Sequence, residues 1–309
     1  MGVFDQVISE PMLRRGWRRV RSNRGMAGGE GVDIAAFEKG LAANLACLGA
    51  ELAAGRYRPG PLQRVEIAKP DGGRRRLAVP PVRDRVVQSA AAIVLDELID
   101  PQLSDASFAY RRGRSVEHAI GRIMTYRLWG AEWVVDGDIE RFFDSVPHRR
   151  LERRLAGHVR CRRTRALVEL WLRRFSRGGR GLAQGAPISP LLANLYLDPV
   201  DRAIDRRGRR LVRYADDFVI LCPDRARAEQ ALRRMAALLE AEGLMPHPDK
   251  TRVVHFADGF QFLGYRFENN LLLSDGSFDL PIDAATLPTS YKEDCRDRVF
   301  LQTYGKMTE

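Results

Sequence analysis

The sequence predicts an α+β fold, in which helices and strands are mixed along the chain. One observation is the helical periodicity of apolar residues in several segments, of which residues 82–100 are an example. Another is a set of runs rich in Val, Ile and Leu, such as 211–222, which are typical of buried strands. The third is size, because 309 residues of which 45% are hydrophobic suffice for a substantial core and for two or three subdomains.

The expected elements follow from this periodicity together with capping and turn residues. Gly55 and Pro101 each end a helix, and Ser115 is a candidate N-cap. Residues 63–80, QRVEIAKPDGGRRRLAVP, contain two alternating runs joined by KPDGG, which predicts a β-hairpin. In chain order, the expected elements are a helix at 34–55, a hairpin at 62–80, helices at 82–100 and 115–130, a strand at 131–138 followed by a short helix, helices at 149–157, 163–179, 191–208 and 225–244, and strands at 211–222 and 260–267.

The composition favours a nucleic-acid partner. The formal net charge is +11, and all but five of the 51 Lys and Arg residues are arginines. Phosphates attract such surfaces, although an arginine-rich composition also reflects a GC-rich genome. The four cysteines form no C-x-x-C pair, so neither a zinc site nor a disulfide framework is indicated. No run of about 18 apolar residues occurs, so we expect no membrane partner and a cytoplasmic location.

Three aspartates lie where strands are expected. Asp216 and Asp217 interrupt the segment LVRYADDFVILC at 211–222, and Asp138 ends another apolar run. Unpaired carboxylates inside a buried strand cost several kcal/mol. If the two strands are neighbours, the three carboxylates converge and repel one another unless a hard cation such as Mg²⁺ neutralises them. The alternative is that these acids cap turns or pair with arginines.

The surrounding motifs resemble those of the group II intron-like branch of prokaryotic reverse transcriptases. RYADDFVIL resembles the YxDD box, and VVDGDIERFFDSV resembles the first aspartate box. GLAQGAPISPLLANLYLDPVD is similar to the QGxPxSPxLxN segment of that branch. Further similar segments are KPDGGRRRLAVPPVRDRVVQ, SFAYRRGRSVEHAI, EGLMPHPDKT and FQFLGYRF. The resemblance covers roughly residues 60–267, and SFAYRRGRSVE is also similar to the CRISPR-associated branch.

This resemblance implies a two-metal nucleotidyl transferase. Asp138 and Asp216 would be the main ligands of two Mg²⁺ ions, for which Mn²⁺ can substitute, and Asp217 would support them. The backbone carbonyl of Ile139 would join the ligands. Phe143 stands where the family places an aromatic steric gate against the ribose 2′-OH, although Phe142 or Phe143 is also expected in the core.

The other implied site residues would hold the substrates. Gln184 and Gly185 begin a loop near the nucleotide and the template. Lys69, Arg74 and Arg76 on the hairpin would hold the triphosphate, with a solvated basic hairpin as the alternative. Lys250 would protonate the leaving pyrophosphate or offset its charge.

The implied fold is a right-hand polymerase. Residues 1–128 would form the fingers and 129–267 the palm, with 268–309 a tail or thumb remnant. The expected reaction is RNA-directed DNA synthesis on an RNA template, from a DNA or RNA primer and dNTPs. A CRISPR integrase or another protein would supply the missing thumb. A retron, abortive-infection or truncated group II intron enzyme, or a non-catalytic nucleic-acid-binding subunit, is the alternative; Phe143 argues against an RNA replicase.

Overall fold

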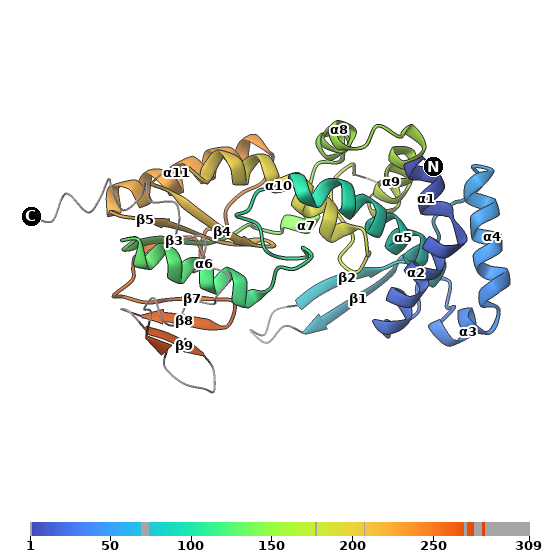
Figure 1. Ribbon diagram of the computed structural model, residues 1–309, viewed down its shortest axis with the longest axis horizontal. Coiled ribbons are helices and arrows are strands. Elements are labelled where there is room, and N and C mark those ends of the chain that lie inside the picture. Colours follow the sequence, from blue (N-terminus) through green and yellow to red (C-terminus); the bar gives the residue numbers. More distant parts are fainter. Residues whose placement is uncertain are drawn as a thin grey trace, which may run out of the picture. The chain divides into compact units, whose positions relative to one another are not determined.

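The computed structural model describes residues 2–68, 74–176, 178–206, 208–268, 271–274 and 280–281 (Figure 1). Two compact units make up the chain: unit 1 contains 1–103 and 141–196, and unit 2 contains 104–140 and 197–309. Lys69 and most of the expected tail lie outside the described residues. The division into fingers, palm and tail stays a prediction.

Unit 1 is mainly helical. Helix α5 is buried along most of its length and packs against α2, and the hairpin of β1 and β2 precedes α5 in the chain. Its elements are α1 (Val3–Ile8), α2 (Glu10–Ser22), α3 (Ile34–Lys39), α4 (Leu41–Ala53), β1 (Gln63–Ala68), β2 (Arg74–Val79), α5 (Val82–Ile99), the 3₁₀ helix η1 (Asp100–Gln102), α7 (Phe142–Ser145), α8 (His148–His158), α9 (Arg162–Phe175) and the first half of α10 (Ser189–Ile204).

Two expectations in unit 1 have different outcomes. Strands β1 and β2 pair antiparallel, from Gln63 opposite Val79 to Ala68 opposite Arg74, so the predicted hairpin is confirmed. The single helix expected at 34–55 was wrong, because Gly40 leaves the helical conformation with φ −114° and ψ 29° and separates α3 from α4. Glycine is a poor helix former, so a break at this position costs little.

Unit 2 is built on an antiparallel sheet of four strands in the order β4-β5-β3-β6. A second antiparallel sheet has the order β10-β9-β8-β7. The elements are α6 (Val116–Leu128), β3 (Trp133–Asp138), the second half of α10, β4 (Arg210–Tyr214), β5 (Asp217–Cys222), α11 (Arg225–Ala241), β6 (Arg252–His255), β7 (Phe260–Phe262), β8 (Tyr265–Glu268), β9 (Leu271–Ser274) and β10 (Leu280–Pro281). These helices and antiparallel sheets confirm the α+β class.

The two faces of the four-stranded sheet are covered by different elements. Helix α11 lies on one face, while α6 and the second sheet lie on the other (Figure 1). Val134 of β3 and Val219 and Leu221 of β5 pack in the core on the α6 side. Because side chains alternate along a strand, Asp138 and Asp217 point to that same side, beyond the end of this apolar core.

Two expected single strands are hairpins. The segment 211–222 folds into β4 and β5 with a turn at Ala215 and Asp216, so the two acids lie at a turn and not in the middle of a buried strand. The segment 260–267 likewise forms β7 and β8. Both turns lack the Asn-Gly or Asp-Gly pair that marks a two-residue hairpin in sequence, which explains the error.

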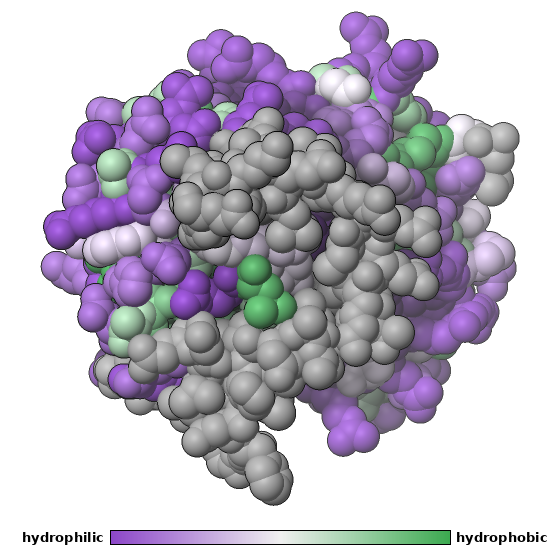
Figure 2. Space-filling model, turned by 60° about the vertical axis from the view of Figure 1, so that its left-hand side comes forward, coloured by the Kyte–Doolittle hydropathy of each residue, from purple (hydrophilic) through white to green (hydrophobic). Residues whose placement is uncertain are grey.

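The described surface carries many charged side chains. In the view of Figure 2, hydrophilic residues dominate the described part of the face, and hydrophobic ones occur in small groups. Among the described residues, no helix is long and apolar enough to cross a membrane.

Candidate active site

The aspartates of the two boxes lie together at one end of the sheet in unit 2. Asp138 is the last residue of β3, and it pairs in register with Asp217, the first residue of β5. Asp216 lies in the adjoining turn, where its carbonyl accepts a hydrogen bond from Ile139 N at 3.1 Å. The end of β3 and the β4–β5 turn are therefore fastened to each other by backbone contacts as well as by pairing.

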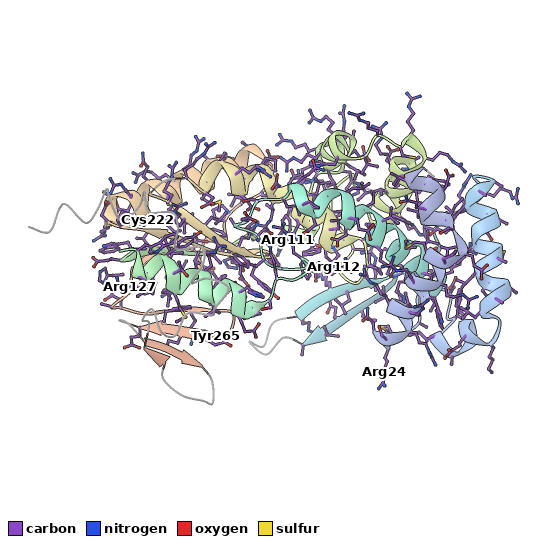
Figure 3. All side chains as sticks on the ribbon, in the orientation of Figure 1. Arg24, Arg111, Arg112, Arg127, Cys222 and Tyr265 are labelled. Carbon is purple, nitrogen blue, oxygen red and sulfur yellow. The ribbon has the colours of Figure 1, made fainter. Side chains whose placement is uncertain are left out.

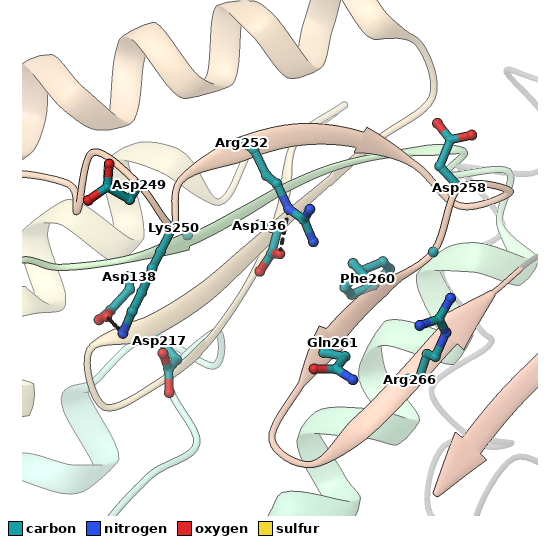
Figure 4. A pocket seen from close by; sticks show the side chains of 12 residues that line it. Asp136, Asp138, Asp217, Asp249, Lys250, Arg252, Asp258, Phe260, Gln261 and Arg266 are labelled. Carbon is teal, nitrogen blue, oxygen red and sulfur yellow. Dashed lines mark hydrogen bonds and ion pairs between the residues drawn. The ribbon is translucent and has the colours of Figure 1, made fainter. Parts of the chain in front are cut away.

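The segment before β6 brings Lys250 to the same place. His247 N donates to Asp138 O at 2.7 Å, and Glu140 N donates to Met245 O at 2.9 Å. These bonds hold the segment alongside the end of β3. Lys250 Nζ then lies 2.9 Å from Asp138 Oδ2 (Figure 4).

The electrostatics of this cluster favour a cation. Partial burial of the Asp217 carboxyl, with the charges of Asp216 and Asp138 adding to it, raises the pKa of Asp217 to about 7, and Lys250 opposes that shift. The side chain of Asp138 is only 13% exposed. Its Oδ1 is buried and has no hydrogen-bond partner among the described residues.

A hard divalent ion fits this donor set, because it needs carboxylate oxygens and would partner the orphan Oδ1. As the side chains stand, no group of three or more His, Cys, Asp or Glu residues within the described ranges is close enough to hold a metal ion. Asp138 Oδ2 is instead engaged by Lys250. A bound ion would therefore displace or share this ammonium contact.

A cavity of about 640 Å³ adjoins the acids (Figure 4). Residues of the four-stranded sheet, among them Asp136, Asp138, Asp217 and Arg252, form one side of it, and residues of β7 and β8 form the other. Arg252 Nε lies 3.4 Å from Asp136 Oδ2, so a second acid of β3 has a basic partner from β6. The cavity thus presents carboxylates and basic side chains within one unit.

Gln184 and Gly185 lie in unit 1, against strand β2. Ala78 N donates to Gln184 O at 2.7 Å. Gly185 has φ +115°, and a Cβ added there would lie 3.4 Å from Ala78 O. The positive φ favours glycine here, since the added Cβ would meet β2 only at about contact distance; sequence reasoning did not foresee that this loop packs against the hairpin. Its predicted approach to a nucleotide stays a prediction.

The hairpin arginines share one acidic partner. Glu66 accepts from Arg74 at 3.0 Å and from Arg76 at 3.2 Å, and both arginine side chains are about four-fifths exposed. The hydrogen bond from Arg74, followed by the one from Arg76, lowers the pKa of Glu66. A cavity of about 980 Å³ next to the hairpin is lined by Arg76, by Gln184 and by further basic residues that include Arg64, Arg174 and Arg180. It is a phosphate-compatible surface within unit 1.

Phe143 is buried in unit 1 and 9% exposed, and Phe142 is 1% exposed. Their rings meet edge to face with centroids 5.5 Å apart. Phe143 O also accepts a hydrogen bond from Leu182 N at 2.6 Å, which links α7 to the loop segment before Gln184. Both phenylalanines therefore contribute to the core, and the gate role of Phe143 stays a prediction.

Comparison with protein families identifies the chain. Residues 67–267 match the model of the reverse transcriptase (RNA-dependent DNA polymerase) family. The chain belongs to the reverse transcriptase family. This confirms the predicted enzyme class, RNA-directed DNA polymerase, and the matched range contains all of the predicted site residues.

Relatives of the reverse transcriptase include Protein YkfC of Escherichia coli (strain K12), 31% identical over 84% of this chain and 81% of that one. The group II intron-encoded protein LtrA of Lactococcus lactis subsp. cremoris is 31% identical over 48% of this chain and 26% of that one, which supports the group II intron-like resemblance. A solved partial Cas6-RT-Cas1–Cas2 complex has a chain with 26% identity and a TM-score of 0.46, covering 78% of this chain and 43% of that one. That likeness assigns no partner.

Proposed function

We propose that this chain extends a primer with dNTPs on an RNA template. The observation that carries the proposal is the register pairing of Asp138 with Asp217 at the open end of the sheet, together with the unpartnered Asp138 Oδ1. Two bound Mg²⁺ ions, for which Mn²⁺ can substitute, would activate the primer 3′-OH and stabilise the leaving pyrophosphate. The reaction joins the 3′ oxygen to the α-phosphorus of a dNTP and breaks the bond between the α-phosphorus and the bridging oxygen.

The residues of unit 2 would hold the reacting end. Asp138 and Asp216 are the proposed main ligands, with Asp217 and the carbonyl of Ile139 in support. Lys250 is already 2.9 Å from Asp138 Oδ2. Lys250 lines the same cavity as the acids, where its ammonium would offset the charge of the pyrophosphate or protonate it.

The residues of unit 1 would select and hold the nucleotide. Phe143, five residues after Asp138 in the chain, is the proposed barrier to a ribose 2′-OH. Arg74 and Arg76 would exchange Glu66 for the triphosphate, because phosphate oxygens suit the arginine fork. Gln184 and Gly185 would lie near the nucleotide. Lys69 belongs to the same proposed set and lies outside the described residues.

The biological setting is a separate proposal. Spacer acquisition from RNA beside a CRISPR integrase, which would also supply a thumb, rests on the resemblance of SFAYRRGRSVE. The retron, abortive-infection and truncated intron settings are the alternatives, and similarity to a Myxococcus xanthus retron enzyme, 29% identical over 60% of this chain, favours examining the first of these. A cytoplasmic location is part of the same proposal. The genes that flank this one decide among the settings.

The deciding experiment measures incorporation of dNTPs and of rNTPs on a primed RNA template with Mg²⁺. We expect dNTP incorporation that Asp216→Asn abolishes. Glu229→Gln, which neutralises an exposed acid on α11, is the matched control and should leave synthesis unchanged. Synthesis that survives Asp216→Asn would contradict the metal-ligand assignment. A wild-type protein that binds the primed template without extending it would indicate a missing thumb or partner protein.

A further inference from the structure

Arg213 of β4 is a buried charge that the proposed chemistry does not use. Its side chain is 2% exposed, and it lies three residues before Asp216. Removing an arginine from water is costly unless its donors find acceptors. The acceptors that the guanidinium contacts therefore show which parts of the fold it holds in place.

The guanidinium joins three parts of unit 2. Nε and Nη2 donate to the two carboxylate oxygens of Asp201 on α10, at 2.7 and 2.6 Å. Nη2 also donates to Ser107 Oγ at 2.9 Å. Nη1 donates to the carbonyl of Ala215 at 2.8 Å. Asp201 is itself 1% exposed, so this is a fork-to-fork contact inside the core.

Backbone contacts fix the same arginine from the other side. Arg213 N donates to Ala106 O at 2.8 Å, and Phe108 N donates to Arg213 O at 2.9 Å. The segment around Ser107 is in turn held by Arg111, labelled in Figure 3, whose Nη1 donates to Ser107 O at 3.1 Å. Both the backbone and the side chain of Arg213 are therefore held in place, two residues before Ala215.

The turn between β4 and β5 is strained. Ala215 has φ +61°, a conformation that costs a non-glycine residue about 1 kcal/mol or more. It is the first of the two turn residues between Tyr214 and Asp217, where a hairpin with one positive φ usually takes glycine. The next two residues are Asp216 and Asp217. Whatever holds Ala215 in this conformation also sets the direction of both carboxylates.

We propose that Arg213, held by Asp201, is a positioning residue that keeps Ala215 in the left-handed conformation and so aims Asp216 and Asp217. The inference rests on the proposed function for its kinetic consequence, but not for its structural one. Ile139 N holds Asp216 O from the end of β3, and the Arg213 side chain on β4 holds Ala215 O. The turn is held between these two contacts.

The test removes the Arg213 side chain together with Asp201, a pair called the clamp below, without leaving a buried charge unpaired. Arg213→Met alone would strand Asp201, so Arg213→Met is combined with Asp201→Leu, a replacement that is often close to neutral for stability. Arg213→Lys is the conservative variant, because a lysine keeps the charge but cannot reach Asp201 and Ala215 O with one planar fork. Arg210→Lys, on the same strand, is the matched control.

Three quantities are measured on each folded variant: amide hydrogen exchange of the 214–218 peptide, Mn²⁺ affinity by electron paramagnetic resonance without nucleotide, and kcat with KM for dNTP. We expect faster exchange of that peptide, Mn²⁺ binding at least fivefold weaker, and kcat about 10- to 100-fold lower with little change in KM, since small misplacements of reacting groups have effects of this size. Arg210→Lys should match the wild type in all three.

The decisive arm adds Ala215→Gly to the clamp variants. Glycine adopts a positive φ without strain, so it should recover part of each loss. If Arg213 had a structural role alone, Ala215→Gly would recover none of the losses in exchange protection, Mn²⁺ binding and kcat, and that result would overturn the proposal. So would wild-type exchange and Mn²⁺ binding in the folded variants. If the wild type makes no DNA, the proposed function fails, whereas exchange and Mn²⁺ binding still decide the role of Arg213.

Discussion

Replacing Lys250 with methionine tests whether the acids at the end of β3 and β5 form a cation site. In the structure the Lys250 ammonium engages Asp138 Oδ2 at 2.9 Å, and the side chains are 51% and 13% exposed. A contact of this kind lies between an exposed ion pair, worth up to about 1 kcal/mol, and a charge-assisted hydrogen bond of about 1.5–3 kcal/mol. We take about 1 kcal/mol because half of the lysine is in solvent.

Two consequences follow for Lys250→Met. Without divalent ions, the free energy of unfolding should fall by about 1 kcal/mol, since Asp138 then lacks partners on both oxygens. Mg²⁺ should bind about fivefold more tightly than in the wild type, because about 1 kcal/mol of competition from the ammonium is gone. Mg²⁺ should therefore stabilise the variant more than it stabilises the wild type.

The assay is urea unfolding in EDTA and at several Mg²⁺ concentrations. Lys39→Met, at the exposed end of α3, is the matched control and should show the wild-type response to Mg²⁺. The reasoning is refuted if Mg²⁺ stabilises Lys250→Met no more than the wild type, or if Lys39→Met behaves like Lys250→Met. Weaker Mg²⁺ binding by Lys250→Met would show that the lysine supports the ion instead of competing with it.

Three further predictions follow from the described contacts. Phe143→Leu should raise the ratio of rNTP to dNTP incorporation about tenfold, whereas Phe142→Leu, in a neighbour that is also buried, should leave the ratio unchanged; equal ratios refute the gate. Gly185→Ala should destabilise the protein by about 1–2 kcal/mol in thermal unfolding, more than Gly31→Ala, because φ +115° at Gly185 lies further from the left-handed region open to alanine than φ +76° at Gly31; equal losses refute this reasoning. The pKa of Asp217 is raised to about 7, so the folded state favours the protonated carboxyl. In EDTA, the free energy of unfolding that this protonation contributes should therefore be lost as pH rises from about 4 through 7, and Mg²⁺ should restore it. Asp217→Asn should lack this part of the pH dependence in urea unfolding at pH 5 and pH 8.

The sequence predicted the elements better than their connections. Helices α5, α6 and α11 lie where apolar periodicity and the caps place them, and Ser115 accepts from His118 N as an N-cap should. The turn at Ala215 was missed because alanine with positive φ leaves no mark in the sequence. The turn of the second hairpin was missed for a similar reason, since its first residue, Leu263, has φ +54°.

The candidate site was predicted where motifs are local and missed where contacts are distant. Asp138 and Asp217 are recognisable from their boxes, and their meeting requires only that β3 and β5 be neighbours. The partner of Arg213 lies 12 residues earlier on α10, and another contact lies 106 residues away at Ser107. In the sequence Arg213 is only a charge in an apolar run, and nothing local distinguishes it from the less buried Arg209 and Arg210.

Gly137 shows how closely the acids depend on the packing behind them. A Cβ at this position would lie 2.5 Å from the ring of Phe218, the residue paired with it across β3 and β5. Side chains alternate, so this ring lies on the face opposite Asp138 and Asp217. The glycine lets the buried ring of Phe218 lie against the β3 backbone, which keeps the two strands in the register that brings the carboxylates opposite each other. The arrangement of the acids is therefore fixed by three contacts: by Phe218 and Arg213, which are paired in register and lie on the face of the sheet opposite the acids, and by Ile139 at the end of β3.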